Sequence, residues 1–313
     1  MSQIPFFARR LLSNLHKNLT NMSKPKTNST SLSATTPVPH THHPTKLSQY
    51  SGLEHLPAAT KLPSIVKLLN LKVEDGIDGT VPAFLHLPKN YQNQQSTAAI
   101  LLSGAGGGVV GPSGIYLSMA DKLASLQHGL PVLRMDYRIP ARNKYCVADV
   151  LAAMGYLTAE YNVSRFVLVG WSFGGAPVFT VGGQDSRVVG CATIASQTAE
   201  TDGIRAVGRR GVPVLLLHGT GDRTLSPQCS ERLYDMYGSK GQRKVHCFEG
   251  DDHALTRNSL ETERMLCEFI ADVAGLNMGK AETEMVNKSL VDQGDKIEIM
   301  KKGGDLKGAE SIE

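Results

Sequence analysis

Residues 165–175 read Arg-Phe-Val-Leu-Val-Gly-Trp-Ser-Phe-Gly-Gly, an apolar run that passes directly into a glycine-rich turn around Ser172. A Gly-x-Ser-x-Gly pattern between a strand and a helix is typical of a strained turn that exposes a serine hydroxyl. Glycines at 170 and 174 leave space where side chains would strike the neighbouring strand or helix. The pattern predicts that Ser172 is a nucleophile, held on an elbow. The elbow consists of Gly170, Trp171, Ser172 and Gly174.

Further apolar runs recur along the chain and alternate with stretches of helical character. They lie at 98–102, 131–135, 166–169, 188–194, 212–217 and 244–248. Short, wholly apolar runs suit strands buried on both faces of a parallel sheet, and their alternation with helices indicates an α/β fold. Residues 65–73 and 81–87 flank a turn and predict an antiparallel hairpin. We therefore expect a mostly parallel, doubly wound sheet that opens with an N-terminal antiparallel hairpin, in one domain over residues 60–275.

A serine hydroxyl needs a base within hydrogen-bond reach, and that base needs a group to orient it. After a serine elbow of this kind, the acid and the histidine follow in that order along the chain. Asp222 stands in a glycine-rich loop after the run 212–217, and His253 follows the run 244–248. The carboxyl ends of strands are where α/β sites assemble. We predict that His253 is the general base and that Asp222 orients it, whereas His218 shapes the acid loop.

A tetrahedral intermediate requires two preorganised N–H donors, which form an oxyanion hole. The backbone N–H of Phe173, next after the serine, is the first candidate. The second is expected from the glycine-rich loop that follows the run 98–102. In that loop Ala105 is the preferred donor and Gly106 the next.

The same loop supports a rival interpretation. Residues 106–111 match the Gly-x-Gly-x-x-Gly spacing of a dinucleotide-binding fingerprint, and Asp136 follows at the end of the next strand. Against this, Pro112 and Ser113 interrupt the helix that the fingerprint requires, and the three predicted catalytic residues stay unexplained. A binding protein that keeps the fold without turnover is a further alternative, which the presence of all three residues disfavours.

The amino-acid composition of the chain limits which kinds of ligand and cellular surroundings fit the protein. The chain has 313 residues and a net charge of +4, and residues 1–50 hold six Lys or Arg and no acid. The remainder is slightly acidic, which argues against nucleic-acid binding. No apolar run is long enough to span a membrane. The five cysteines are scattered without a Cys-x-x-Cys pair, which favours free thiols inside the cell. Neither a metal ion nor an organic cofactor is predicted.

The two ends of the chain differ in composition from the middle. Residues 1–55 are rich in Ser, Thr, Asn and Pro, and they begin with apolar residues at helical spacing around Arg9 and Arg10. They predict either a transit peptide, with a mitochondrial location, or a disordered extension of a cytoplasmic protein. Residues 276–313 are charged and poor in apolar residues, so we expect a weakly ordered or helical tail.

The serine elbow, the loop with Asp222 and the loop with His253 resemble the three catalytic loops of the α/β-hydrolase superfamily. The resemblance covers about residues 62–275. The motif Leu-Arg-Met-Asp-Tyr-Arg at 133–138 resembles the esterase and acylaminoacyl-peptidase-like branches, and the hairpin ending in Leu-Pro at 87–88 resembles the dienelactone-hydrolase-like branch. The resemblance implies that Arg134 and Asp136 brace the loop near the oxyanion hole. The chain departs from dienelactone hydrolases in having Ser rather than Cys at 172, and Ser103 stands where many members carry His.

The function that these observations predict is a serine hydrolase. It would cleave a carboxylic ester or thioester of a small molecule through an acyl-serine intermediate. The runs ending near 194 and starting near 212 leave room for one short helix and no large cap domain, so an open site is expected. An acyltransferase or a peptidase/amidase would use the same three residues, because water, alcohols and amines compete for one acyl-enzyme.

Overall fold

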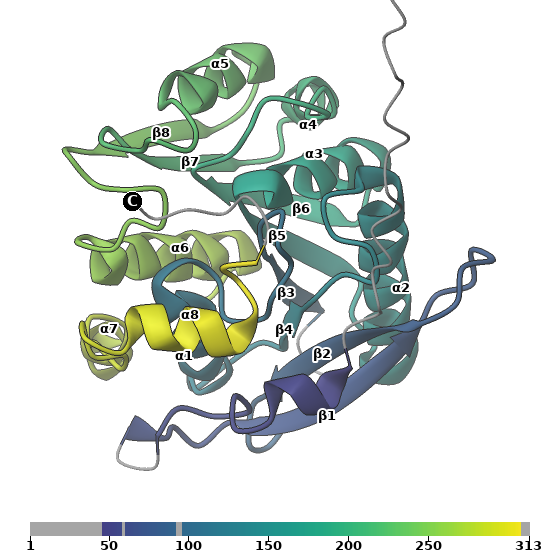
Figure 1. Cartoon of the computed structure of the whole chain (residues 1–313), viewed down its shortest axis with the longest axis vertical. Helices are drawn as coiled ribbons and strands as arrows, with labels where there is room; N and C mark the ends of the chain where they lie inside the picture. Colours follow the sequence, from purple (N-terminus) through teal and green to yellow (C-terminus); the bar gives the residue numbers. More distant parts are fainter. Residues whose placement is uncertain (1–45, 58–59, 92–95, 308–313) are drawn as a thin grey trace, which may run out of the picture. The chain divides into compact units, whose positions relative to one another are not determined.

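The computed structural model describes residues 46–57, 60–91 and 96–307. Most of the predicted N-terminal extension, residues 1–45, lies outside the described residues, as does the end of the predicted tail, 308–313. An eight-stranded open sheet runs through the centre in the order β1-β2-β4-β3-β5-β6-β7-β8 (Figure 1). The strands are β1 Ile65–Lys72, β2 Thr80–Leu87, β3 Thr97–Leu102, β4 Val132–Met135, β5 Arg165–Trp171, β6 Val188–Ile194, β7 Val214–Gly219 and β8 Arg243–Phe248.

Strand directions follow the expectation from sequence. β1 pairs antiparallel with β2, and β2 pairs antiparallel with β4. The strands from β4 to β8 pair in parallel. The predicted fold class, a mostly parallel sheet opened by an antiparallel hairpin, is therefore confirmed.

Helices cover both faces of this sheet, and each face buries its own apolar core (Figure 1). One core includes residues of α2 Asn143–Tyr161, α3 Gly175–Gln184, α4 Ile204–Arg210 and α5 Gln228–Tyr237. The other includes residues of α1 Ile115–Ala124, α6 Ser259–Ala274, α7 Lys280–Val286 and α8 Lys296–Gly303. Between β6 and β7 the chain forms the single helix α4, so no large cap domain is inserted there.

The order of the strands reverses at β3, and this reversal positions the site. β4 lies on one side of β3, and β5 lies on the other. The helices that follow, α1 and α3, therefore pack on opposite faces, and the loops that leave β3 and β5 diverge. Open α/β sheets bind ligands at such a switch point. The glycine-rich loop follows β3 and the serine elbow follows β5, so both lie at this point.

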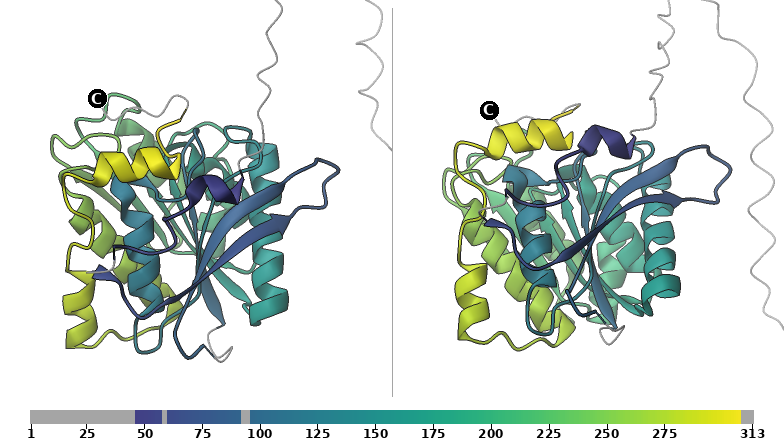
Figure 2. Two further views of the ribbon diagram at one scale, coloured as in Figure 1. Left: turned by 60° about the horizontal axis from the view of Figure 1, so that its bottom comes forward. Right: turned by 90° about the horizontal axis from the view of Figure 1, so that it is seen from below.

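Both ends of the described chain pack more closely than the composition suggested. Tyr50, at the end of the short helix η1 Leu47–Tyr50, is buried in the same core as α1. Val286 of α7 and Met300 of α8 join that core, so the described part of the tail, residues 276–307, contains two helices that pack against the domain. Its few apolar residues suffice because each helix buries one face. Figure 2 shows η1 and α8 next to each other at one end of the sheet.

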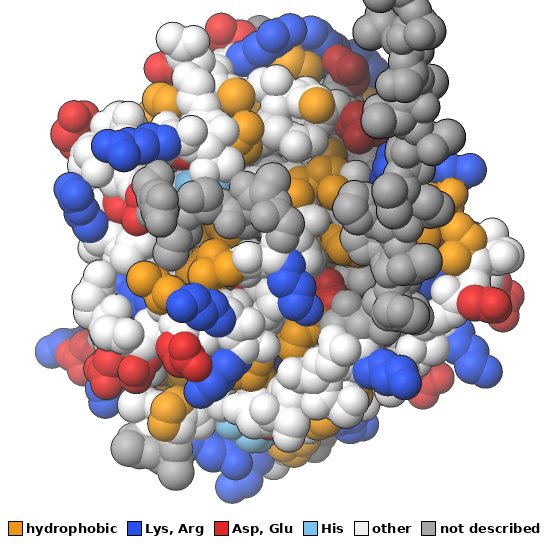
Figure 3. All heavy atoms as spheres, in the orientation of Figure 1, with side chains coloured by type: hydrophobic (Ala, Val, Ile, Leu, Met, Phe, Trp, Pro, Cys, Tyr) orange, Lys and Arg blue, Asp and Glu red, His pale blue; other side chains and the backbone are white. Residues whose placement is uncertain are grey.

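Surface charges are mixed on the face shown in Figure 3, where basic and acidic side chains are interspersed. Among the described helices, none combines the length and the apolar character that a membrane span requires.

Candidate active site

Ser172 begins the short helix η4 Ser172–Gly174, which joins β5 to α3. Its φ angle is +54°, a left-handed conformation that costs energy for a residue with a Cβ. The glycines on either side are required by close approach. A Cβ at Gly170 would collide with the backbone of Gly174, and a Cβ at Gly174 would lie 2.7 Å from the carbonyl oxygen of Ser103. The turn is therefore held tightly against β5 and the glycine-rich loop.

The loop that carries His253 lies against the serine elbow. Trp171 donates a hydrogen bond from Nε1 to the carbonyl oxygen of His253 at 2.9 Å. The centroids of the two rings are 5.4 Å apart, and Trp171 is completely buried. Trp171 therefore connects the loop that carries His253 to the serine elbow.

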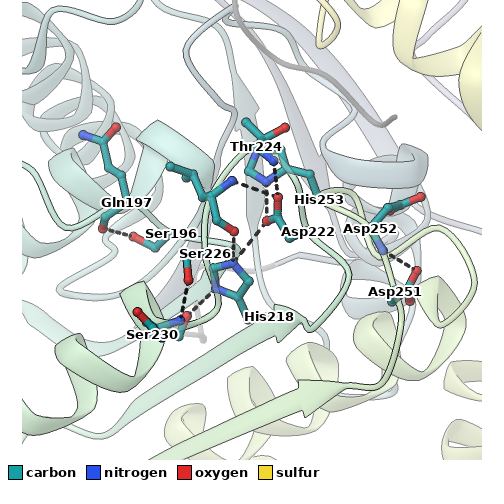
Figure 4. Close-up of polar contacts among 12 residues, drawn as sticks. Ser196, Gln197, His218, Asp222, Thr224, Ser226, Ser230, Asp251, Asp252 and His253 are labelled. Carbon is teal, nitrogen blue, oxygen red and sulfur yellow. Dashed lines mark hydrogen bonds and ion pairs between the residues drawn. The ribbon is translucent and has the colours of Figure 1, made fainter.

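Asp222 and His253 are joined by a hydrogen bond of 2.7 Å between Oδ2 and Nδ1. Asp222 also accepts hydrogen bonds from Nε2 of His218 at 3.1 Å and from the N–H groups of Thr224 and Leu225 at 2.8 and 2.9 Å. Figure 4 shows both imidazoles pointing toward this carboxylate. Burial alone would raise the pKa of Asp222, but the hydrogen bonds from the two histidines outweigh burial and hold the pKa well below its usual range.

A charged Asp222 fixes how the imidazole of His253 carries its proton. The carboxylate only accepts, so Nδ1 of His253 donates to it. The neutral ring then has an unprotonated Nε2, which is the atom a general base requires.

His218 holds the acid loop in place, as the sequence predicted. Its Nε2 faces two acceptors, Asp222 and the carbonyl oxygen of Leu225 at 3.1 Å, so this nitrogen carries the proton. Its Nδ1 lies 2.8 Å from Oγ of Ser230 and accepts from that hydroxyl. His218 is fully buried and both ring nitrogens are engaged, which leaves no nitrogen free to act as a base.

The predicted oxyanion donors lie at two neighbouring turns. Phe173 is in the first turn of the helix after Ser172, where backbone N–H groups have no partner within the helix. Ala105 and Gly106 form the tip of the turn between Gly104 and Gly107, which pair with each other. Because the serine elbow closely approaches Ser103, the turn with Ala105 and Gly106 lies beside the turn with Phe173.

The glycine-rich loop is braced from β4 and its end, as the resemblance implied. Arg134 is fully buried and donates from Nη1 to the carbonyl oxygen of Val109 at 2.9 Å. Asp136 accepts from the N–H of Gly108 at 2.9 Å and from the hydroxyl of Tyr50. The N-terminal segment thus contributes to the brace through Tyr50, which sequence reasoning had placed in the extension.

A residue near the C-terminal end, Asp305, was not predicted. Its carboxylate accepts hydrogen bonds from the N–H groups of residues 109–111 and from Ser103. No motif marks it, because its partners lie about 200 positions earlier in the chain. A dinucleotide would need these same N–H groups for its phosphates. In the segment that matches the dinucleotide fingerprint, these N–H groups are therefore already bound to Asp305.

Within the described part of the chain, no group of three or more His, Cys, Asp or Glu residues is arranged to hold a metal ion.

An open, mostly parallel sheet with a serine elbow after β5, an acid after β7 and a histidine after β8 defines an α/β-hydrolase fold. Residues 134–284 match the model of the dienelactone hydrolase family, so the resemblance seen in the sequence is confirmed. No curated protein sequence matches the chain.

Several solved structures share the fold. Est1E from Butyrivibrio proteoclasticus has a TM-score of 0.53 and 17% identity, covering 66% of this chain and 99% of its own. The Pyrococcus furiosus esterase Pf2001 has a TM-score of 0.54 and 13% identity, covering 68% and 92%. The Pyrococcus horikoshii acylaminoacyl peptidase has a TM-score of 0.55 and 12% identity, covering 72% and 44%. These structures show the shared fold, and the family match supports an enzyme of the hydrolase kind.

Proposed function

We propose that the protein is a serine hydrolase that cleaves a carboxylic ester or thioester of a small molecule through an acyl-serine intermediate. The observation that carries this proposal is the 2.7 Å hydrogen bond between Asp222 and His253, on a loop that Trp171 links to the Ser172 elbow. The match to the dienelactone hydrolase family supports a hydrolase.

In the proposed mechanism, Nε2 of His253 takes the proton of Ser172 while Oγ attacks the acyl carbon. Asp222 remains ionised and stabilises the imidazolium that forms. The oxyanion accepts hydrogen bonds from the N–H of Phe173 and from that of Ala105 or Gly106. His253 then returns the proton to the leaving alcohol or thiol. A water molecule then attacks the acyl-serine while His253 takes its proton. His253 returns this proton to Oγ of Ser172, and the carboxylic acid is released.

The direct test is labelling of the full chain with a fluorophosphonate, beside hydrolysis of a panel of esters and thioesters. We expect Ser172→Ala to lose labelling and to lower kcat by at least about 10³-fold, because the nucleophile is gone. Ser186→Ala is the matched control, since Ser186 is exposed and lies outside the site. A folded wild-type protein that neither labels nor hydrolyses any member of the panel would contradict the proposal.

Amide hydrolysis is a second candidate function, because one of the similar structures is an acylaminoacyl peptidase. An amidase or an acyltransferase would share the acyl-serine intermediate. Adding alcohols and amines to the ester assay separates the candidates, because an acyltransferase gives acylated alcohol or amine in place of free acid. An amidase would cleave amides of the same acyl group.

A further inference from the structure

Asp305 follows α8 and is completely buried, although it carries a carboxylate. Oδ1 accepts from the N–H of Gly111 at 2.8 Å and from the hydroxyl of Ser103. Oδ2 accepts from the N–H groups of Val110 at 3.0 Å and Val109 at 3.2 Å. A buried carboxylate is stable only where such donors compensate for lost hydration. The contacts show that both oxygens are fully engaged by one loop.

These donors lie at the two ends of the glycine-rich loop, which spans residues 103–111. Ser103 stands at its start, and residues 109–111 stand at its end. The tip with Ala105 and Gly106 lies between them. One carboxylate therefore ties the two ends of the loop together and so fixes the position of its tip.

The loop packs closely against this carboxylate and the residues after it. A Cβ at Gly108 would collide with the carboxyl group of Asp305, and a Cβ at Gly106 would collide with the carbonyl group of Lys307. The carbonyl oxygen of Gly303 accepts a further hydrogen bond from the N–H of Val109 at 3.1 Å. Residues 303–307 thus follow the contour of the loop.

The same C-terminal segment also contacts the histidine loop. Lys296 of α8 donates from Nζ to the carbonyl oxygen of Thr256 at 2.7 Å. Ser113, whose N–H lies 3.1 Å from Sδ of Met300, donates from Oγ to the carbonyl oxygen of Ala254 at 2.9 Å. The segment therefore contacts both loops that the proposed mechanism uses.

We propose that Asp305 is a positioning residue, which holds the glycine-rich loop so that the N–H groups at its tip face the oxyanion. The inference rests on the proposed serine-hydrolase function. Asp305 acts through the loop and does not touch the substrate. A donor of this kind acts when the carbonyl oxygen gains charge in the transition state, so its displacement lowers kcat and leaves KM nearly unchanged.

The test is Asp305→Asn, which keeps the shape of the side chain but replaces one acceptor oxygen by an N–H donor. Burial raises the pKa of Asp305 to about 7, so the assay is run at pH 8, where the carboxylate form predominates. We expect kcat for an ester to fall about 10- to 100-fold with KM unchanged, as for a misplaced catalytic group. Affinity for an alkyl boronic acid, which forms a tetrahedral adduct on the serine, should fall in parallel.

Asp295→Asn is the matched control, because Asp295 lies in the same segment, is exposed and makes no side-chain cap. It should leave kcat, KM and boronate affinity unchanged. Ser103→Ala is the second variant, in case Asp305→Asn does not fold. It removes one donor and keeps the carboxylate, so we expect a smaller loss in kcat.

Fluorophosphonate labelling separates the two ways in which the test can fail. If the folded wild-type protein does not label at Ser172, the proposed function is overturned, and this inference with it. If the wild type labels but both variants keep the wild-type kcat, the inference alone is overturned. A higher kcat in Asp305→Asn would also overturn it, because the segment would then restrain the site.

Discussion

The side chain of Asp222 accepts four hydrogen bonds. Two imidazoles and two backbone N–H groups donate to its oxygens. Four donors favour the charged form, and this explains why the pKa stays low although burial opposes ionisation. Its role in the proposed mechanism is therefore to orient His253 and to stabilise the imidazolium.

Asp222→Asn tests that role. An amide in this place can offer an N–H to Nδ1 of His253, which selects the wrong tautomer and leaves Nε2 protonated. We expect kcat to fall about 10³- to 10⁴-fold, with the unfolding midpoint in urea as a check on the fold. Asp202→Asn is the control, because the side chain of Asp202 is 89% exposed. A loss of less than tenfold would show that Asp222 does not orient the base.

Elements with a periodic or wholly apolar sequence could be predicted. The run 188–194 coincides with β6 Val188–Ile194, and the glycines around Ser172 match a turn where the structure leaves no room for a Cβ. The helices α7 and α8 were not distinguished from a weakly ordered tail. Their burial depends on partners far away in the chain, and Lys296 and Asp305 are buried polar residues that an apolar pattern cannot reveal.

The packing of α8 gives a test at the scale of one helix. Met300 is 1% exposed, and it contacts the start of the helical segment after the glycine-rich loop through Ser113. We expect Met300→Ala to lower the free energy of unfolding by about 2–5 kcal/mol, because it leaves a cavity in the core. Ile297→Ala on the same helix is the control, since Ile297 is 44% exposed and should change stability by less than about 0.5 kcal/mol. Equal effects in urea titrations would mean that α8 is not packed as described.

At the scale of the whole described chain, a buried polar network joins the opening hairpin, β4 and α1 beneath the glycine-rich loop. Nδ1 of His86 in β2 lies 2.8 Å from Oδ1 of Asp121 in α1. The same oxygen accepts a hydrogen bond from Oγ of Ser64 at 2.6 Å. Arg134 of β4 donates from Nε to Nε2 of His86 at 3.0 Å and from Nη2 to the carbonyl oxygen of Leu53 at 2.8 Å. The network therefore connects the N-terminal segment to the strand that braces the site.

This network predicts how stability depends on pH. A guanidinium can only donate, so Nε2 of His86 is unprotonated and its Nδ1–H donates to Asp121. Burial, with the nearby charge of Arg134, lowers the pKa of His86 from 6.5 to about 4. Below about pH 6.5 the unfolded chain takes up a proton at this residue that the folded chain refuses until about pH 4. Stability from this group is thus complete above pH 6.5 and is lost as the pH falls, by about 3 kcal/mol.

Urea titrations at pH 7 and pH 4.5 on the wild type and on His86→Gln isolate this contribution, because glutamine cannot titrate. Other ionisable groups affect both proteins and cancel in the comparison. His86→Gln should be the less stable protein at pH 7, since glutamine cannot reproduce both hydrogen bonds of the ring. The difference between the two should narrow at pH 4.5, where the wild type has lost most of the contribution of His86. A difference that stays constant with pH would mean that His86 is not held neutral between Arg134 and Asp121, and the link from the N-terminal segment to the glycine-rich loop would need another basis.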